Sequence, residues 1–156
     1  MDYLILKTIH ILSSVIMVGT GFGSALYMFC ANRWGNLEQK RFVSQMVVMV
    51  DWIFTTPSVI IQPLTGYLMM RQAGFGFHDP WLQNVLWLYI LVGCAWIPVV
   101  WIQIKMSALT RIAVHTQTTL NPVYTIYQKV WETLGYIGFS GTMAIFYIMT
   151  TKQALW

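Results

Sequence analysis

Residues 4–19 read LILKTIHILSSVIMVG, and this apolar stretch continues through Leu26 to Phe29. A helix of about 20 mostly apolar residues crosses the hydrocarbon core of a bilayer. The stretch is too long for the apolar core of a cleavable signal peptide, and no small-residue cleavage site follows a short core. The sequence therefore predicts a permanent membrane span near residues 3–30.

The composition of the whole chain is also typical of a membrane protein. Of the 156 residues, 57% are hydrophobic and only 9% are charged, whereas soluble domains carry about 25% charged residues. Further apolar stretches predict spans near residues 42–70, 82–106 and 123–149. We therefore expect an all-α integral membrane four-helix bundle, in which residues 1–156 form a single transmembrane domain.

The distribution of basic residues predicts the orientation of the chain. With both termini on the outer side, the inner ends of the spans carry six basic residues, Arg33, Lys40, Arg41, Lys105, Arg111 and Lys129, and the outer ends carry three, Lys7, Arg71 and Lys152. The positive-inside bias favours this orientation. Four tryptophans fall near predicted span ends, where indole rings prefer the membrane interface: Trp34, Trp81, Trp131 and Trp156.

Several classes of function are excluded by missing motifs. The sequence has no nucleophile elbow, phosphate-binding loop or metalloprotease helix, so a hydrolase or kinase of the soluble type is not indicated. It also has no basic stripe with interleaved aromatic residues, so nucleic acid is not an expected partner. The expected partner is the lipid bilayer. The small residues of the first span also leave open the formation of a homo-oligomer.

The second span carries the clearest polar stripe. Polar or Met side chains recur at steps of four and three: Asp51, Thr55, Ser58, Gln62, Thr65 and Met69. Because lipid-facing positions should be apolar, this stripe predicts one wall of a polar interior. Pro57 and Pro63 are expected to kink the helix and free backbone carbonyls. Whether the kinks shape a cavity or serve packing alone is left open.

Charged residues within the spans predict a buried polar layer near the inner side. Its members are Asp51, Lys105, Lys129 and Glu132. Because a lone charge at membrane depth costs at least a few kcal/mol, we expect these groups to pair. The expected pairs join Asp51 to Lys105 or Lys129, and Glu132 to the remaining base. Structural ion pairs are favoured over a proton relay.

His10 lies within the first span, where hydrocarbon offers its imidazole no water. It shares a helix face with Ser14 and Met17, and the alternation of helix direction places it level with Gln62. His78 follows in the next connection on the same side. Three uses of His10 remain open: haem or metal ligation, proton transfer, or a hydrogen bond to a facing helix.

A site for a metal ion alone is weakly supported. His10 and His78, with no Cys or carboxylate cluster nearby, form a poor zinc set, while copper held by His and Met remains conceivable. Haem suits a helical bundle, because facing helices supply axial ligands and a flat apolar slot. Candidate slot residues are Gly19, Gly21, Phe22, Gly23 and Trp87.

Motifs in three spans carry a family resemblance. They are Leu6-Lys7-Thr8-Ile9-His10-Ile11-Leu12 with Gly19-x-Gly21, Asp51-Trp52-x-Phe54-x-x-Pro57 with Gln62-Pro63-Leu64-Thr65-Gly66, and Trp96-Ile97-Pro98 through Met106. The chain resembles a bacterial family of predicted integral membrane proteins of unknown function. The similarity runs through all four spans.

The first span is also similar to two better-known groups, the four-helix bacterial protoporphyrinogen oxidases and the membrane domain of copper-resistance D proteins. The oxidase resemblance implies a b-type haem held by His10. It also implies a second ligand, a Lys near the start of the third helix, but residues 81–88 contain no Lys. The oxidase reaction is therefore not carried over. The sixth ligand would be His78, Met17 or Met69, or the iron would be five-coordinate.

The leading hypothesis is a haem b-binding protein of the bacterial inner membrane, with both termini periplasmic and a redox or electron-transfer role. His10 would be an axial ligand supported by Gln62, and Ser14 and Ser58 would orient the ring. A quinone or a redox protein would be the electron partner, and membrane oxidoreductase activity is left open. The alternative is a small transport or accessory subunit whose polar path is lined by Asp51, Thr55, Ser58 and Gln62.

Overall fold

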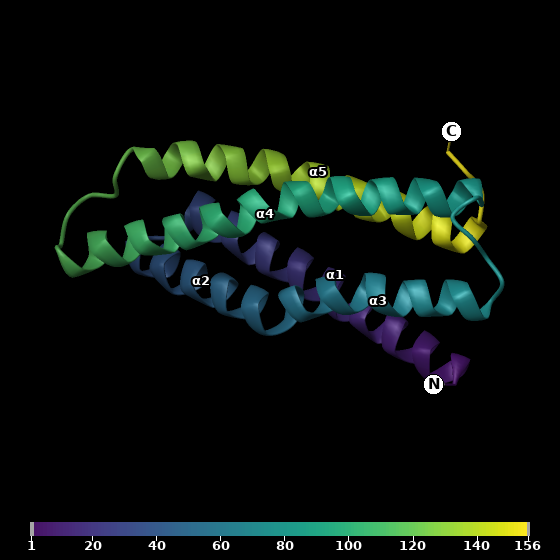
Figure 1. Cartoon of the computed structure of the whole chain (residues 1–156). Helices are drawn as coiled ribbons and strands as arrows, with labels where there is room; N and C mark the ends of the chain where they lie inside the picture. The colour runs from purple at the N-terminus through teal and green to yellow at the C-terminus, as the bar shows by residue number, and fades with distance from the viewer. Residues whose placement is uncertain (1, 156) are drawn as a thin grey trace.

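The computed structural model describes residues 2–155 as helices joined by short connections. The helices are α1 (Tyr3–Trp34), α2 (Leu37–Val50), the π-helical turn η1 (Asp51–Thr55), α3 (Thr56–Gln72), α4 (Pro80–His115) and α5 (Val123–Thr151). Because α2, η1 and α3 run on without a break, the chain forms four long helical rods (Figure 1). All four are long and apolar enough to cross a membrane. The prediction of an all-α four-helix membrane bundle is confirmed.

Helix α4 forms the third of the four rods, and it extends well beyond the predicted third span at residues 82–106. Its 36 residues correspond to a length of about 54 Å at 1.5 Å per residue, whereas the hydrocarbon core is about 30 Å thick. The extension is anchored by Thr110, which is fully buried and lies 3.1 Å from the Ser44 hydroxyl of α2. Hydropathy detects only the apolar part of such a helix, so the sequence underestimated its length.

The second span changes its hydrogen-bond pattern where kinks were expected. In η1 the Thr56 N–H donates to the Asp51 carbonyl, five residues earlier, rather than to the carbonyl four residues earlier. Pro57 follows directly and has no N–H to donate, so a regular α-helical pattern cannot continue through it. Pro63 lies inside α3 without ending it. The irregular turn therefore begins at Asp51.

One cluster of buried hydrophobic residues lies in one half of the bundle. It comprises Met28, Val47, Ile102, Met106, Tyr124 and Trp131. These residues lie in the half near the connections at residues 35–36 and 116–122, which we call the distal half. Trp131 is only 5% exposed, so its predicted place at the membrane interface is wrong, because the indole fills this core. Trp156 lies outside the described residues.

The other half, which contains both chain ends and the 73–79 connection, we call the terminal half; it buries Leu6, Met70 and Ile148 near its end. Here α1 packs on α3 and α4 packs on α5, but in the described chain α3 makes at most isolated contacts with α4 or α5. One link is the Tyr89 hydroxyl, which donates to the Val59 carbonyl. A Cβ added at Gly93 would meet nothing within 4 Å. The two helix pairs separate toward this end (Figure 1).

Substitution of Tyr124 by Phe tests the distal core. The buried Tyr124 hydroxyl donates to Asn32 Oδ1 at 2.6 Å, and Asn32 Nδ2 has no partner among residues 2–155. Removing the hydroxyl leaves the whole Asn32 amide unpaired, so we expect a loss of about 1–2 kcal/mol in the free energy of unfolding. Denaturant unfolding in detergent micelles measures the loss.

Tyr127→Phe is the matched control. The Tyr127 ring packs edge-on against Trp101 at 5.8 Å, and its hydroxyl makes no hydrogen bond within the described chain. The control should therefore retain wild-type stability. Equal stability of the two variants would contradict the role given to the Tyr124–Asn32 bond.

Candidate functional site

The first part of the candidate site surrounds His10, at the contact between α1 and α3. His10 Nδ1 lies 2.8 Å from Thr65 Oγ1. The Thr65 hydroxyl also lies 2.8 Å from the Ile61 carbonyl oxygen, and its single hydrogen is donated to that carbonyl within α3. In this arrangement Thr65 accepts a hydrogen from His10 Nδ1, which favours the Nδ1–H tautomer. Nε2 keeps a free lone pair.

Three further contacts hold His10 in place. The Gln62 side-chain amide donates to the His10 backbone carbonyl at 2.9 Å, and the Ser13 hydroxyl donates to the same oxygen at 3.1 Å. A Cβ at Gly66 would lie 3.3 Å from His10 Cε1, so the imidazole uses space that this glycine provides. Gln62 was correctly placed level with His10, but it supports the backbone, whereas Thr65 supports the ring.

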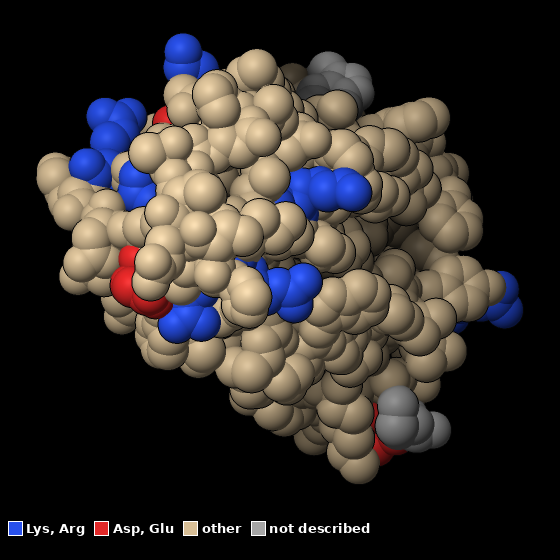
Figure 2. All heavy atoms as spheres, turned by 90° about the vertical axis from the view of Figure 1, so that its left-hand side faces the viewer, with Lys and Arg blue, Asp and Glu red and all other residues tan. Residues whose placement is uncertain are grey.

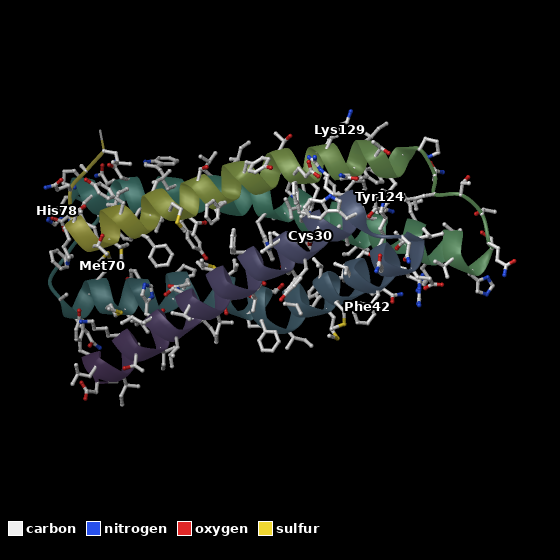
Figure 3. All side chains as sticks on the ribbon, turned by 180° about the vertical axis from the view of Figure 1, so that it is seen from behind. Cys30, Phe42, Met70, His78, Tyr124 and Lys129 are labelled. Atoms are coloured by element: carbon white, nitrogen blue, oxygen red, sulfur yellow. The ribbon has the colours of Figure 1, made fainter. Side chains whose placement is uncertain are left out.

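The other predicted cofactor residues are less closely associated with His10. Ser14 is half-buried and donates to the Ile11 carbonyl of its own helix at 2.7 Å. Met17 is half-buried. His78 is exposed and lies over Gly76 in the connection before α4 (Figure 3). Within residues 2–155, no group of three or more His, Cys, Asp or Glu side chains comes together to hold a metal ion.

Two aromatic residues predicted to line a haem slot lie on the outside of the bundle. Trp87 is 64% exposed and Phe22 is 53% exposed. The Phe22 ring packs against Phe139 of α5, with ring centroids 5.3 Å apart. Their place in a haem slot stays a prediction. Gly21 remains beside open space.

The second part of the candidate site surrounds Asp51, which is only 4% exposed. The Asp51 carboxyl oxygen Oδ1 lies 2.9 Å from Thr55 Oγ1, and the Gln103 side chain of α4 lies beside the carboxyl group. Thr55 Oγ1 lies 3.2 Å from Thr20 Oγ1 of α1. Three elements therefore meet at Asp51, and all of its side-chain partners are neutral.

The predicted pairing of Asp51 with Lys105 or Lys129 is wrong, because both lysines are exposed. Lys105 Nζ lies 5.5 Å from the centroid of the Trp101 ring, and Lys129 projects from α5 (Figure 3). Two residues of an α-helix correspond to about 200° of rotation, so when Gln103 faces η1, Lys105 faces away. Long lysine side chains also reach polar surroundings readily.

Glu132 pairs with a different base from those expected. Its carboxylate Oε2 lies 3.9 Å from Arg33 Nη2, and its Oε1 accepts a hydrogen bond from Gln128 at 2.9 Å. This group belongs to the distal half, where Lys and Arg side chains gather on the end of the bundle (Figure 2). The predicted buried layer of four charges is thus replaced by one buried acid, Asp51, and a peripheral ion pair.

The predicted polar stripe of the second span is confirmed as buried. Its five polar members are each 4–6% exposed: Asp51, Thr55, Ser58, Gln62 and Thr65. With Thr20, Ser13 and His10 of α1 they form what we call the polar seam, which follows the contact of α1 with η1 and α3. From Asp51 to Thr65 it extends about 21 Å along the helix axis.

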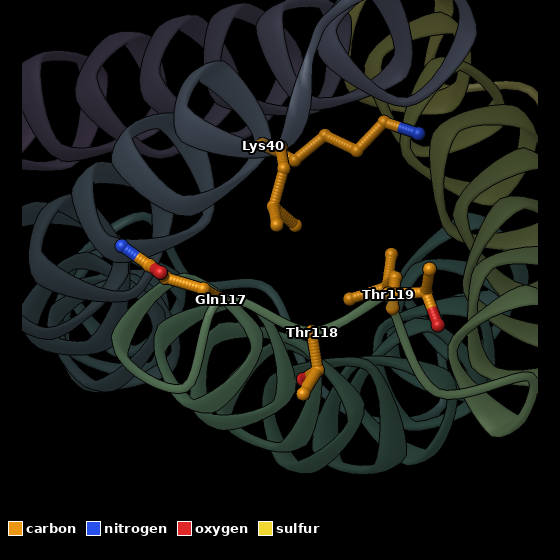
Figure 4. A pocket seen from close by; sticks show the side chains of 6 residues that line it. Lys40, Gln117, Thr118 and Thr119 are labelled. Carbon is orange, nitrogen blue, oxygen red and sulfur yellow. The ribbon is translucent and has the colours of Figure 1, made fainter.

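Two surface depressions lie at the distal end of the bundle. One is lined by side chains near the α4–α5 connection (Figure 4): Leu37, Lys40, Gln117, Thr118, Thr119 and Leu120. A second adjoins it beside Pro122. Both belong to the distal end, remote in the fold from His10, and neither includes a residue of the polar seam.

Comparison with known proteins agrees with the architecture. Neither a curated protein nor a solved structure matches the chain. The model of a family described as "Predicted integral membrane protein (DUF2269)" matches residues 4–153. Since this match includes nearly the whole of all four apolar helical rods, the chain belongs to this family of integral membrane proteins.

Proposed function

We propose that the protein binds a b-type haem within the membrane, with His10 as an axial ligand, and serves a redox or electron-transfer role. One observation carries the proposal: His10 Nδ1 lies 2.8 Å from Thr65 Oγ1, whose hydroxyl is also in reach of the Ile61 carbonyl, an arrangement that favours a protonated Nδ1 and an unprotonated Nε2. An imidazole whose Nδ1–H is hydrogen-bonded is the usual form of a metal-ligating histidine. The resemblance of the first span to haem-binding oxidases supports the same assignment.

The surroundings of His10 are compatible with a flat ligand. In the terminal half, which contains His10, α3 makes at most isolated contacts with α4 or α5 within the described chain, and a Cβ at Gly93 would meet nothing within 4 Å. A haem, when bound, would supply one-electron chemistry, while the chain would hold and orient it. Met17, Met69 and His78 remain the candidates for a sixth ligand, and five-coordinate iron remains the alternative. A quinone or a redox protein is the proposed electron partner.

Titration with haem tests the proposal. Haem added to the detergent-solubilised protein should give a Soret absorption change that saturates at about one haem per chain, as expected for one axial His site. Detergent micelles without protein are the blank, and His10→Ala is the matched variant. A change that rises without saturation, or that is equal in His10→Ala, would overturn the assignment.

A second candidate function, a transport or accessory subunit with a proton path, is favoured by the polar seam. The seam buries hydroxyl and amide groups next to lipid-facing helices, where apolar side chains would pack at lower cost. It also contains two titratable groups: His10, at the end of the seam in the terminal half, and Asp51, at the opposite end. Polar chains of this kind are typical of proton pathways in membrane proteins.

Substitution of Asp51 by Asn tests this second candidate. If the seam carries protons, the variant in proteoliposomes should lose at least about 90% of the proton flux, because the amide cannot accept and release a proton in the pathway. A pH-sensitive dye inside the vesicles reports the flux. Glu132→Gln, which replaces an acid outside the seam, should retain it. Unchanged flux in Asp51→Asn would exclude a path through Asp51.

A further inference from the structure

The end of the polar seam at Asp51 contains a chain of four oxygen atoms. Asp51 Oδ1 lies 2.9 Å from Thr55 Oγ1, Thr55 Oγ1 lies 3.2 Å from Thr20 Oγ1, and Thr20 Oγ1 lies 2.6 Å from the Ile16 carbonyl oxygen. Each of the three hydrogen bonds requires a hydrogen of its own. The carbonyl has none, and the two threonine hydroxyls provide only two. An ionised Asp51 therefore leaves this chain one hydrogen short.

We propose that Asp51 holds a proton inside the membrane and shares it in a hydrogen bond to Thr55. The protonated carboxyl group donates to Thr55, Thr55 donates to Thr20, and Thr20 donates to the Ile16 carbonyl, so every contact has one donor and one acceptor. With Asp51 ionised, Thr55 donates to Asp51 and Thr20 to Ile16. The Thr20 and Thr55 oxygens would then face each other with lone pairs alone, and if Thr20 donated to Thr55 instead, its 2.6 Å contact with the Ile16 carbonyl oxygen would have no hydrogen.

The charges around Asp51 favour the neutral acid. The ion pairs within the described chain are Arg33–Glu132 and Arg41–Glu38, and neither includes Asp51. The other titratable or charged groups on the packed elements are directed elsewhere. His10 of α1 contacts Thr65, Arg41 of α2 contacts Glu38, and Lys105 of α4 lies over Trp101. The remaining ones lie toward the helix ends: Lys7, Lys40, Arg71, Arg111 and His115. An unpaired carboxylate at this depth costs several kcal/mol, which protonation avoids.

The side chain of Gln103, which lies beside Asp51, also indicates a shortage of hydrogens. Gln103 is 4% exposed, and its amide group contacts the Asp51 carboxyl group. Its Oε1 is buried without a hydrogen-bond partner among residues 2–155. The cluster thus has more acceptors than hydrogens. It is built at a π-helical turn, a feature frequent at functional sites, and it requires neither haem nor transport to bind a proton.

Infrared spectroscopy of the solubilised protein tests the proposal. At neutral pH the wild type should show the carbonyl stretch of a protonated carboxylic acid that shifts in D2O, and Asp51→Asn should lose this band. Glu132→Gln is the control and should keep it. Thr55→Val removes the acceptor of the Asp51 proton, so the band should move to higher frequency, which also provides a result if Asp51→Asn does not fold.

Three outcomes would overturn the proton site. One is the absence of any protonated carboxyl band at neutral pH, and another is a band that neither Asp51→Asn nor Thr55→Val alters. The third is stabilisation by Na⁺ of the wild type but not of Asp51→Asn, which would identify a metal cation in place of the proton. The band should persist in His10→Ala, so failure of the haem proposal leaves this test intact.

Discussion

Replacement of His10 by alanine should reduce the Soret absorption of the purified protein to the level of detergent containing free haem. In the account given above, His10 Nε2 is the free nitrogen that binds iron, and its orientation is fixed by Thr65. An alanine provides no ligand, so the ratio of Soret to protein absorbance should fall by at least about tenfold, as expected when an axial ligand is lost.

His115→Ala is the matched control for this substitution. His115 is exposed at the end of α4, in the distal half of the bundle, so its loss should leave the spectrum unchanged. Added imidazole should partly restore the Soret band of His10→Ala by occupying the vacated space beside Gly66. Retention of the full Soret band in His10→Ala, with its unfolding temperature unchanged, would rule out His10 as an axial ligand.

Replacement of Thr65 by valine should weaken haem binding by about 10- to 100-fold, the usual effect of removing a group that orients a metal ligand. Valine keeps the shape of threonine but cannot accept the hydrogen of His10 Nδ1. The imidazole would then lose its fixed tautomer and orientation. The dissociation constant from haem titration measures this effect.

Thr65→Ser keeps the hydroxyl and should restore most of the affinity. The comparison of Ser with Val separates hydrogen bonding from packing, since both variants alter the packing of the Thr65 side chain, which is 6% exposed. If Val and Ser weaken haem binding equally, the hydroxyl has no orienting role. If neither changes the dissociation constant, the Thr65–His10 bond does not serve ligation.

The number of spans was predictable because it depends on length and composition alone. Four apolar stretches are long enough to cross the bilayer, and short connections between them leave an antiparallel bundle as the simple solution. The stripe from Asp51 to Thr65 was also predictable, because polar residues at steps of four and three share one face of a helix. Its burial follows from the cost of exposing such a face to lipid.

The partners within the bundle were harder to predict, because depth along a helix does not specify rotation about its axis. Lys105 has a depth similar to that of Asp51, yet Gln103 is the residue of α4 that faces η1. Thr20 lies on α1 just beside the face assigned from His10, so its contact with Thr55 was missed. Thr65 was on the predicted stripe, but its bond to His10 required the register of α1 against α3.

The absorption spectrum of the protein, purified in detergent from haem-replete cells, tests the central claim most directly. If His10 ligates haem, the protein should be coloured, with a Soret band, about one haem per chain, and a change in the visible bands on chemical reduction, as for a b-type haem. A colourless and monodisperse protein that also fails to take up added haem would contradict haem ligation by His10.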